Sequence, residues 1–207
     1  VNVGGDLSDA QEGAAIIAHE NVMRRMVDFK PSLPFPALPT ETYFTDFYKL
    51  STHFNGEGIQ LIHAATAHTD GDSIVYFRHS EVIAAGDVFS TVSYPVIDLA
   101  KGGSIQGTID ALAMILDLAV AEARSQGGTW IIPGHGRLSD SADVASYRNM
   151  LVMIRDRIQD AIKSGMTLQQ VKTAKLTRDF DGRYGSTTGA WTTDMFIEAV
   201  YRSLTAK

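Results

Sequence analysis

Apolar residues recur at helical spacing in the second half of the chain. Ser104 follows a pair of glycines and is a good helix N-cap residue, and apolar positions after it return every three or four residues. They predict a helix whose buried face carries Ile105, Ile109, Leu112, Leu116 and Val120. A second long helix is predicted over residues 142–163, with Gly165 as its stop. A capping box at residues 167–170 should open a shorter helix, and a last helix is predicted near 194–204.

The first half of the chain alternates apolar and polar residues, which is the spacing of β-strands. A helical turn or two is predicted at residues 20–27, and four prolines between residues 30 and 40 indicate an ordered surface loop. Strands are predicted at residues 14–18, 42–50, 59–64, 73–77, 81–85 and 129–132. The last of them is expected to end at Pro133. Strand-rich stretches mixed with helices predict an α/β (α+β) protein in which helices cover the sheets.

Composition limits the possible functions. A chain of 207 residues fits one domain over residues 1–207, and 44% hydrophobic with 20% charged residues is ordinary for a soluble globular protein. A formal net charge of −6 without a basic run predicts no nucleic-acid partner. No apolar stretch reaches the about 18 to 20 residues of a membrane span, so no membrane partner is predicted. Cytoplasm and bacterial periplasm both stay open, because a signal peptide could precede Val1.

Three short stretches place a metal-binding side chain just after an apolar run. They are AHTDGD with His68, AGDVF with Asp87 and IPGHG with His135. Imidazole and carboxylate groups at strand ends are ligands that hold zinc, and the absence of cysteine leaves His, Asp and Glu as the ligand types. Asp87 follows His68 by 19 residues (87 − 68) and His135 follows Asp87 by 48 (135 − 87), so the fold must bring them together.

Each of these residues also has an ordinary structural interpretation. His68 could be a strand-end histidine that is hydrogen-bonded to backbone, while Asp87 could be a turn residue after Gly86. His135 could belong to a simple glycine-rich turn. Around His68, Asp70 and Asp72 could orient the imidazole or cap the turn.

The order AHTDGD, AGD and PGHG resembles the metallo-β-lactamase superfamily of binuclear metal hydrolases, which includes glyoxalase II. Further stretches that are similar to single-domain members of this group cover nearly all of the chain: VGG at residues 3–5, IIAHENV at 16–22, YP at 94–95, GGS at 102–104 and YRNML at 147–151. The resemblance implies the αββα sandwich of that superfamily. His19 lies in one of these stretches, without a chemical role that we can assign.

The resemblance also implies a site and a reaction. His68 would complete the three-histidine set of a first metal, Asp87 would bridge two metals, and His135 would serve the second. Two Zn²⁺ ions, or iron or manganese in their place, would hold a hydroxide that attacks the ester, thioester or amide carbonyl of a small-molecule substrate. A homo-oligomer is possible.

The superfamily's main metal motif, H-x-H-x-D-H, is missing. The six histidines include no H-x-H pair, and the chain opens at Val1 with VNVGGD, which is similar to the segment that follows this motif. We therefore expect a fragment, the C-terminal two-thirds or so of the domain, with the N-terminal portion of the sandwich absent. A general base is expected upstream of Val1. The chain by itself is predicted to be inactive and to bind zinc weakly.

Two alternatives stay open. One is a di-iron redox relative of the same fold, which the upstream motif would distinguish because such proteins keep a carboxylate in it. The other is a degenerate, non-catalytic binding protein that really begins at Val1. Among the remaining histidines, His63 is expected to be a satisfied core residue rather than to line the pocket, and His53 and His79 are expected to be exposed. Tyr94 could face substrate or form a packing corner.

Overall fold

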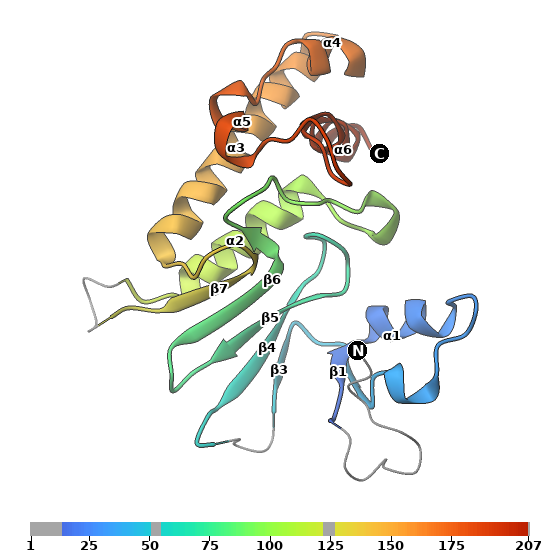
Figure 1. Cartoon of the computed structure of the whole chain (residues 1–207), viewed down its shortest axis with the longest axis vertical. Coiled ribbons are helices and arrows are strands. Elements are labelled where there is room, and N and C mark those ends of the chain that lie inside the picture. The colour runs from blue at the N-terminus through green and yellow to red at the C-terminus, as the bar shows by residue number, and fades with distance from the viewer. Residues whose placement is uncertain (1–13, 51–54, 122–126, 207) are drawn as a thin grey trace.

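The computed structural model describes residues 14–50, 55–121 and 127–206, and its centre is a five-stranded sheet (Figure 1). The strand order is β3-β4-β5-β6-β7, formed by β3 (Phe47–Lys49), β4 (Ile59–Ala64), β5 (Asp72–Phe77), β6 (Val82–Ser90) and β7 (Trp130–His135). Neighbouring strands are antiparallel from β3 to β6, whereas β6 and β7 are parallel. A parallel pair needs a long crossover, and α2 (Ile105–Leu118) lies in it.

A second, two-stranded sheet lies beside the first. Strand β1 (Ile17–His19) runs parallel to β2 (Glu41–Tyr43), with α1 (Glu20–Val27) and the 3₁₀ helix η2 (Phe35–Ala37) between them. Strand β1 contacts β5 of the larger sheet. The single strand predicted at residues 42–50 is wrong, because the chain bends at residues 44–46 and its two halves, β2 and β3, join different sheets. The alternation of apolar and polar residues reflects only local spacing. It continues through the bend, so it does not reveal that the segment divides into two strands.

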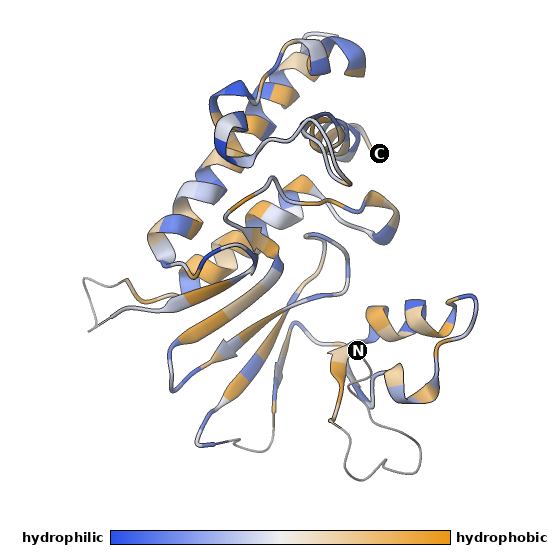
Figure 2. Ribbon diagram, viewed as in Figure 1, coloured by the Kyte–Doolittle hydropathy of each residue, from blue (hydrophilic) through white to orange (hydrophobic). Residues whose placement is uncertain are grey.

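Helices cover one face of the five-stranded sheet. Helix α2 packs on β4 and β6, and α3 (Ser141–Lys163) and α6 (Thr193–Thr205) pack on α2 (Figure 1). Figure 2 shows hydrophobic residues along the central strands and on the helices above them. The largest fully buried side chains of this core include Phe89, Tyr147, Phe196, Ile62, Ile74, Ile83, Leu112 and Ile131. Among the described residues no helix has the length and apolar character to cross a bilayer.

Local capping explains where the helices begin and end. The Ser104 hydroxyl accepts a hydrogen bond from the Gly107 N–H at 2.9 Å, as its N-cap position predicts. Thr167 and Gln170 form the expected capping box at the start of α4 (Leu168–Thr173). Gly165 has φ 81° just after α3, a left-handed conformation that suits glycine. Helix α5 (Arg178–Tyr184) was not predicted, since Thr177 makes no side-chain cap there.

Candidate functional site

His68 lies in the loop between β4 and β5, where backbone contacts fix its position. The Asp98 N–H donates to the His68 carbonyl at 2.9 Å. Gly103 approaches the same carbonyl so closely that a Cβ at position 103 would come within 2.9 Å of the His68 carbonyl carbon and nearer still to its oxygen. Residues 98–103, about thirty positions further along the chain, therefore hold the backbone that carries the imidazole.

The His68 ring is oriented by a backbone carbonyl. Its Nδ1 lies 2.8 Å from the Val96 carbonyl oxygen, which can only accept a hydrogen bond. In the neutral ring Nδ1 must therefore carry the hydrogen, and Nε2 keeps a free lone pair. That Nε2 faces the Asp87 carboxylate at 4.0 Å. An imidazole that donates through one nitrogen and presents the other is the usual state of a metal-binding histidine.

Asp87 projects from an irregular part of β6. We predicted it at a strand end, which is wrong, because β6 continues to Ser90. The pairing of β6 with β7 shifts register on both sides of Gly86, and Asp87 follows that glycine in the shifted stretch. A bulge of this kind turns a side chain away from the regular sheet face. Gly134 lies alongside, where a Cβ would be 2.6 Å from the Gly86 oxygen and 2.8 Å from Asp87 Oδ1.

His135 is the last residue of β7, as its place after the apolar run predicted. Its Nε2 lies 3.2 Å from Asp87 Oδ1. The backbone turns at Gly136, whose φ of 105° favours glycine, and a Cβ there would collide with the Thr91 hydroxyl. That hydroxyl accepts a hydrogen bond from the Arg137 N–H at 3.0 Å.

The structure thus brings the three candidate ligands together around the Asp87 carboxylate. The exposed fraction of the side chain rises from 24% for His68 to 50% for Asp87 and 70% for His135, so the group opens to solvent. The donor types suit zinc, but a catalytic zinc has about three protein ligands. Within residues 14–50, 55–121 and 127–206, no three His, Asp or Glu side chains form a group that could hold a metal ion. Their ligand role stays a prediction.

The two aspartates after His68 stabilise the loop rather than the imidazole. Asp72 accepts from the Thr69 N–H at 2.9 Å and from the Thr69 hydroxyl at 3.0 Å, so it caps the turn. Burial raises the pKa of Asp72, and the Thr69 hydrogen bonds oppose that shift. Asp70 pairs with Arg25 of α1. The group that orients His68, the Val96 carbonyl, has no sequence signal because every residue carries a carbonyl.

His19 and His63 form a second cluster that joins the two sheets. Their rings stack with centroids 3.6 Å apart, and His63 Nε2 lies 2.8 Å from the Asp70 carbonyl oxygen. His19 is buried, caps α1 by accepting from the Asn21 N–H at 3.3 Å, and meets the Tyr43 ring edge-on. His63 is thus a satisfied, partly buried histidine, as expected, and His79 is exposed. His53 lies outside the described residues.

The His19 pair predicts a pH-dependent stability. Burial, followed by the charge of His63 and then of Arg24, lowers the pKa of His19 below 6.5, while the charges of Glu20 and Asp70 oppose the shift. The unfolded chain then binds a proton more readily than the folded protein, so the free energy of unfolding falls as the pH drops below about 6.5. Replacing His19 with Asn keeps a side-chain acceptor for the cap, and should flatten this dependence.

Urea unfolding at about pH 7.5 and about pH 5.5 measures the effect. The difference in the urea midpoint between the two pH values reports the change in stability that is linked to proton binding. His79→Asn, at an exposed turn, is the matched control and should behave as the parent does. Equal pH slopes for the parent and His19→Asn would contradict the prediction.

Tyr94 forms a packing corner. It is buried, its hydroxyl donates to Asp181 Oδ1 at 2.8 Å and lies 3.2 Å from the Thr177 carbonyl, and its ring stacks on Phe196. Burial and the Asp181 carboxylate raise its pKa well above the ordinary tyrosine value. The residue therefore anchors the loop after β6 to α5 and α6.

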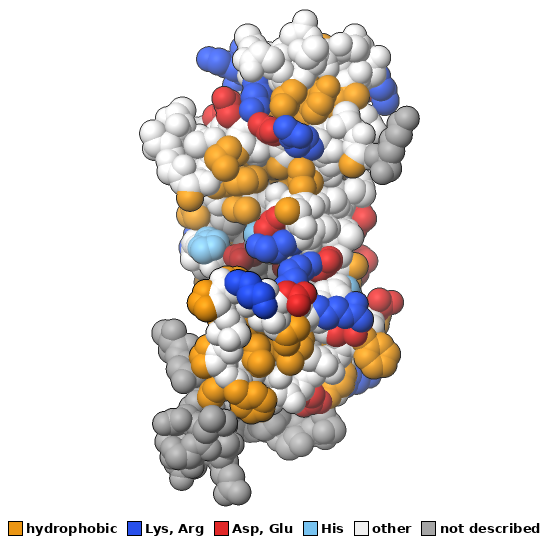
Figure 3. Space-filling view, turned by 90° about the vertical axis from the view of Figure 1, so that its right-hand side faces the viewer, with side chains coloured by type: hydrophobic (Ala, Val, Ile, Leu, Met, Phe, Trp, Pro, Cys, Tyr) orange, Lys and Arg blue, Asp and Glu red, His pale blue; other side chains and the backbone are white. Residues whose placement is uncertain are grey.

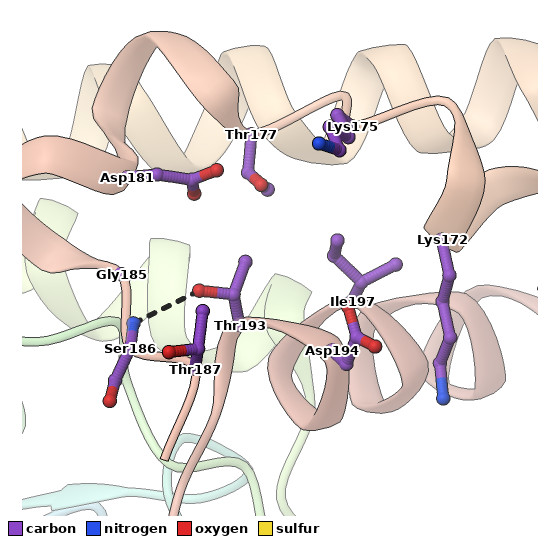
Figure 4. Close-up of a pocket in the computed structure, with 10 residues that line it drawn as sticks. All are labelled: Lys172, Lys175, Thr177, Asp181, Gly185, Ser186, Thr187, Thr193, Asp194 and Ile197. Atoms are coloured by element: carbon purple, nitrogen blue, oxygen red, sulfur yellow. Dashed lines mark hydrogen bonds between the residues drawn. The ribbon is translucent and has the colours of Figure 1, made fainter.

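A cavity of about 520 Å³ lies between α4, α5 and the start of α6, and its lining residues are drawn in Figure 4. Lys172, Lys175 and Thr177 lie on one side and Thr193 on the other, with the Ser186 N–H donating to the Thr193 hydroxyl at 3.1 Å. None of the candidate metal ligands lines this cavity, and no histidine does. It is separate from the group around Asp87.

No protein-family model and no curated protein sequence matches this chain. Solved structures do. A metallo-β-lactamase from Pontibacter korlensis matches with a TM-score of 0.50 and 15% identity, over 72% of this chain and 63% of that protein. The inverting sec-alkylsulfatase Pisa1 from a Pseudomonas species has a TM-score of 0.56 and 12% identity, over 80% and 26%. The metallo-β-lactamase DIM-1 has a TM-score of 0.51 and 14% identity, over 70% and 61%.

This chain therefore has the metallo-β-lactamase fold, and the predicted α/β (α+β) class is confirmed. The chain spans less than two thirds of each of these three proteins, at 63%, 26% and 61% of their lengths. The likeness to glyoxalase II and the missing H-x-H-x-D-H motif stay predictions.

Proposed function

We propose that this chain is part of a metal-dependent hydrolase in which His68, Asp87 and His135 are metal ligands. The remaining ligands of the centre would lie outside the described residues. The observation that carries the proposal is that two atoms with free lone pairs, His68 Nε2 and Asp87 Oδ2, face each other at 4.0 Å. In the neutral ring, whose hydrogen is donated to the Val96 carbonyl, no hydrogen lies between them. A tetrahedral metal with ligand bonds of about 2.0 to 2.2 Å would draw these two atoms somewhat closer together.

The proposed reaction is the hydrolysis of an ester, thioester or amide of a small molecule. A bound zinc ion would supply an activated water and polarise the substrate carbonyl. The protein's own contribution is positional: the Val96 carbonyl holds the His68 proton at Nδ1, and the Gly86 bulge directs the Asp87 carboxylate between the two histidines. Iron or manganese is compatible with nitrogen and oxygen donors as well. The shared fold with two metallo-β-lactamases and an alkylsulfatase supports this proposal.

Zinc titration of the full chain tests the ligand assignment. We expect the imidazole NMR signals of His68 and His135 to shift together as Zn²⁺ is added, while those of His79 stay in place. Replacing His68 with Asn should weaken the zinc response of His135 by about tenfold or more, because a shared centre loses one ligand. His79→Asn is the control. A response of His135 that does not depend on His68 would count against the shared site.

Chelation tests the reaction in the protein purified from its source cells with its metal. EDTA should abolish hydrolysis of p-nitrophenyl acetate and of an acetyl thioester, and added Zn²⁺ should restore it. Full activity in the metal-free protein would refute the metallohydrolase proposal. Bound iron without hydrolysis would favour the redox alternative.

A further inference from the structure

An apolar groove lies beside the loop that orients His68. It has a volume of about 440 Å³ and lies between residues 96–99 and residues 191–202, which include most of α6. Val96 and Leu99 line one side, and Trp191, Met195 and Ala199 line the other. Figure 3 shows hydrophobic side chains gathered on this face of the molecule, directly above histidine side chains near its middle. The volume falls within the about 300 to 1,000 Å³ of small-molecule sites.

The charged groups at the rim are already paired within the protein. Glu198 contacts Lys172 at 2.7 Å and Arg202 at 2.8 Å, while Asp98 contacts Lys101 at 2.8 Å. These contacts lower the pKa of Glu198 and of Asp98, so both carboxylates stay ionised and occupied by their partners. The groove therefore offers an apolar surface whose rim carboxylates are already paired.

Trp191, which lines the groove, carries a buried polar atom without a partner among the described residues. The indole N–H of Trp191 is buried and has no hydrogen-bond acceptor among the described residues. An indole nitrogen can only donate, and a buried donor without an acceptor is destabilising. Because this nitrogen is closed off from solvent, a ligand could accept a hydrogen bond from it only after the indole ring moved.

The groove shares residues with the candidate metal site. Val96 presents its side chain to the groove and its carbonyl to His68 Nδ1 at 2.8 Å. Asp98 lines the groove and donates its N–H to the His68 carbonyl at 2.9 Å. A ligand in the groove therefore contacts the same short segment that holds the imidazole in place.

We propose that this groove binds the apolar acyl or aryl part of an uncharged carboxylic-acid derivative, whose other end would reach the group around Asp87. As a substrate site the groove rests on the proposed hydrolase function, but its binding of apolar ligands does not depend on metal. The occupant follows from the lining: apolar side chains face the hydrocarbon part of the ligand, and the carboxylates at the rim are already paired.

Tryptophan fluorescence in EDTA tests the groove without the metal. The chain has two tryptophans, so Trp130→Phe leaves Trp191 as the only reporter. We expect hexanamide to change the Trp191 emission saturably, and acetamide, which lacks the apolar chain, to bind at least about tenfold more weakly. Equal or absent responses to the two amides would overturn the proposal.

Two matched methionine variants locate the binding. Met195 lines the groove and Met153 lies on α3 outside it, and both are 43% exposed. Met195→Glu should weaken hexanamide binding about tenfold or more through an unpaired charge in the groove, while Met195→Leu and Met153→Glu should preserve it. Equal weakening by both Glu variants would also overturn the proposal. Loss of the zinc response with intact hexanamide binding would contradict the hydrolase proposal alone.

Discussion

Replacing Asp87 with Ala should lower the zinc affinity of the full chain by about 10- to 100-fold or more. Asp87 places one carboxylate oxygen 3.2 Å from His135 Nε2 and the other 4.0 Å from His68 Nε2, so its removal takes away the group that both imidazoles face. In the metal-loaded protein from its source, turnover of ester and thioester substrates should fall by a similar factor. Calorimetric titration with Zn²⁺ and steady-state kinetics measure the two effects.

Two further variants make this result specific. Asp87→Asn keeps the shape of the side chain and removes its charge. A zinc affinity between those of the parent and of Asp87→Ala would show that the position and the charge of the carboxylate each contribute. Asp117→Ala, at an exposed position of α2, should leave zinc binding unchanged. If Asp87→Ala bound zinc as tightly as the parent, Asp87 could not be a ligand.

The elements that the sequence predicted best are those with local signals. The helix at residues 20–27 and the strand at 59–64 have the bounds that we predicted, and the capping box at 167–170 forms as expected. Side-chain spacing and cap residues act within one or two turns of chain, so the sequence alone contains the relevant information. The fold class followed from the same patterns and from the family resemblance.

The elements that were missed depend on contacts between distant segments. Residues 42–50 divide between two sheets, and β6 extends through Asp87 because β7 pairs with it as far as Ser90. Pro133 lies inside β7 rather than at its end. Strand β7 is at the edge of the sheet, where a missing N–H is tolerated. Nothing local in the sequence encodes which strand becomes an edge.

The same distinction applies to the candidate site, where some features have local sequence signals and others depend on contacts between distant segments. The types and order of His68, Asp87 and His135 could be read from motifs, and the structure places their side chains together. The Val96 carbonyl, the Gly86 bulge and the groove beside α6 could not be read in that way. They arise from backbone atoms and from segments about a hundred residues apart, whose proximity only the fold creates.

A single methyl group at Gly103 should disrupt this arrangement severely. A Cβ there would meet the backbone of His68 and the Ala67 oxygen rather than a flexible side chain, so one of two backbones must move. The same junction carries the Ser104 N–H, which lies 2.8 Å from the Thr66 oxygen and 3.1 Å from the Ala67 oxygen. Movement there would weaken the start of α2 and displace the His68 imidazole.

We therefore expect Gly103→Ala to lower the free energy of unfolding by about 3 kcal/mol or more, at or above the upper end of overpacking effects. Gly182→Ala is the matched control, because it lies in α5 with open space around the added methyl group and no positive φ. That control should stabilise the protein by about 0.4 to 1 kcal/mol through the reduced entropy of the unfolded chain. Urea unfolding followed by circular dichroism measures both. If Gly103→Ala were as stable as Gly182→Ala, the close contact at His68 would be an incorrect description of this loop, and the positioning of His68 by residues 96–104 would have to be abandoned with it.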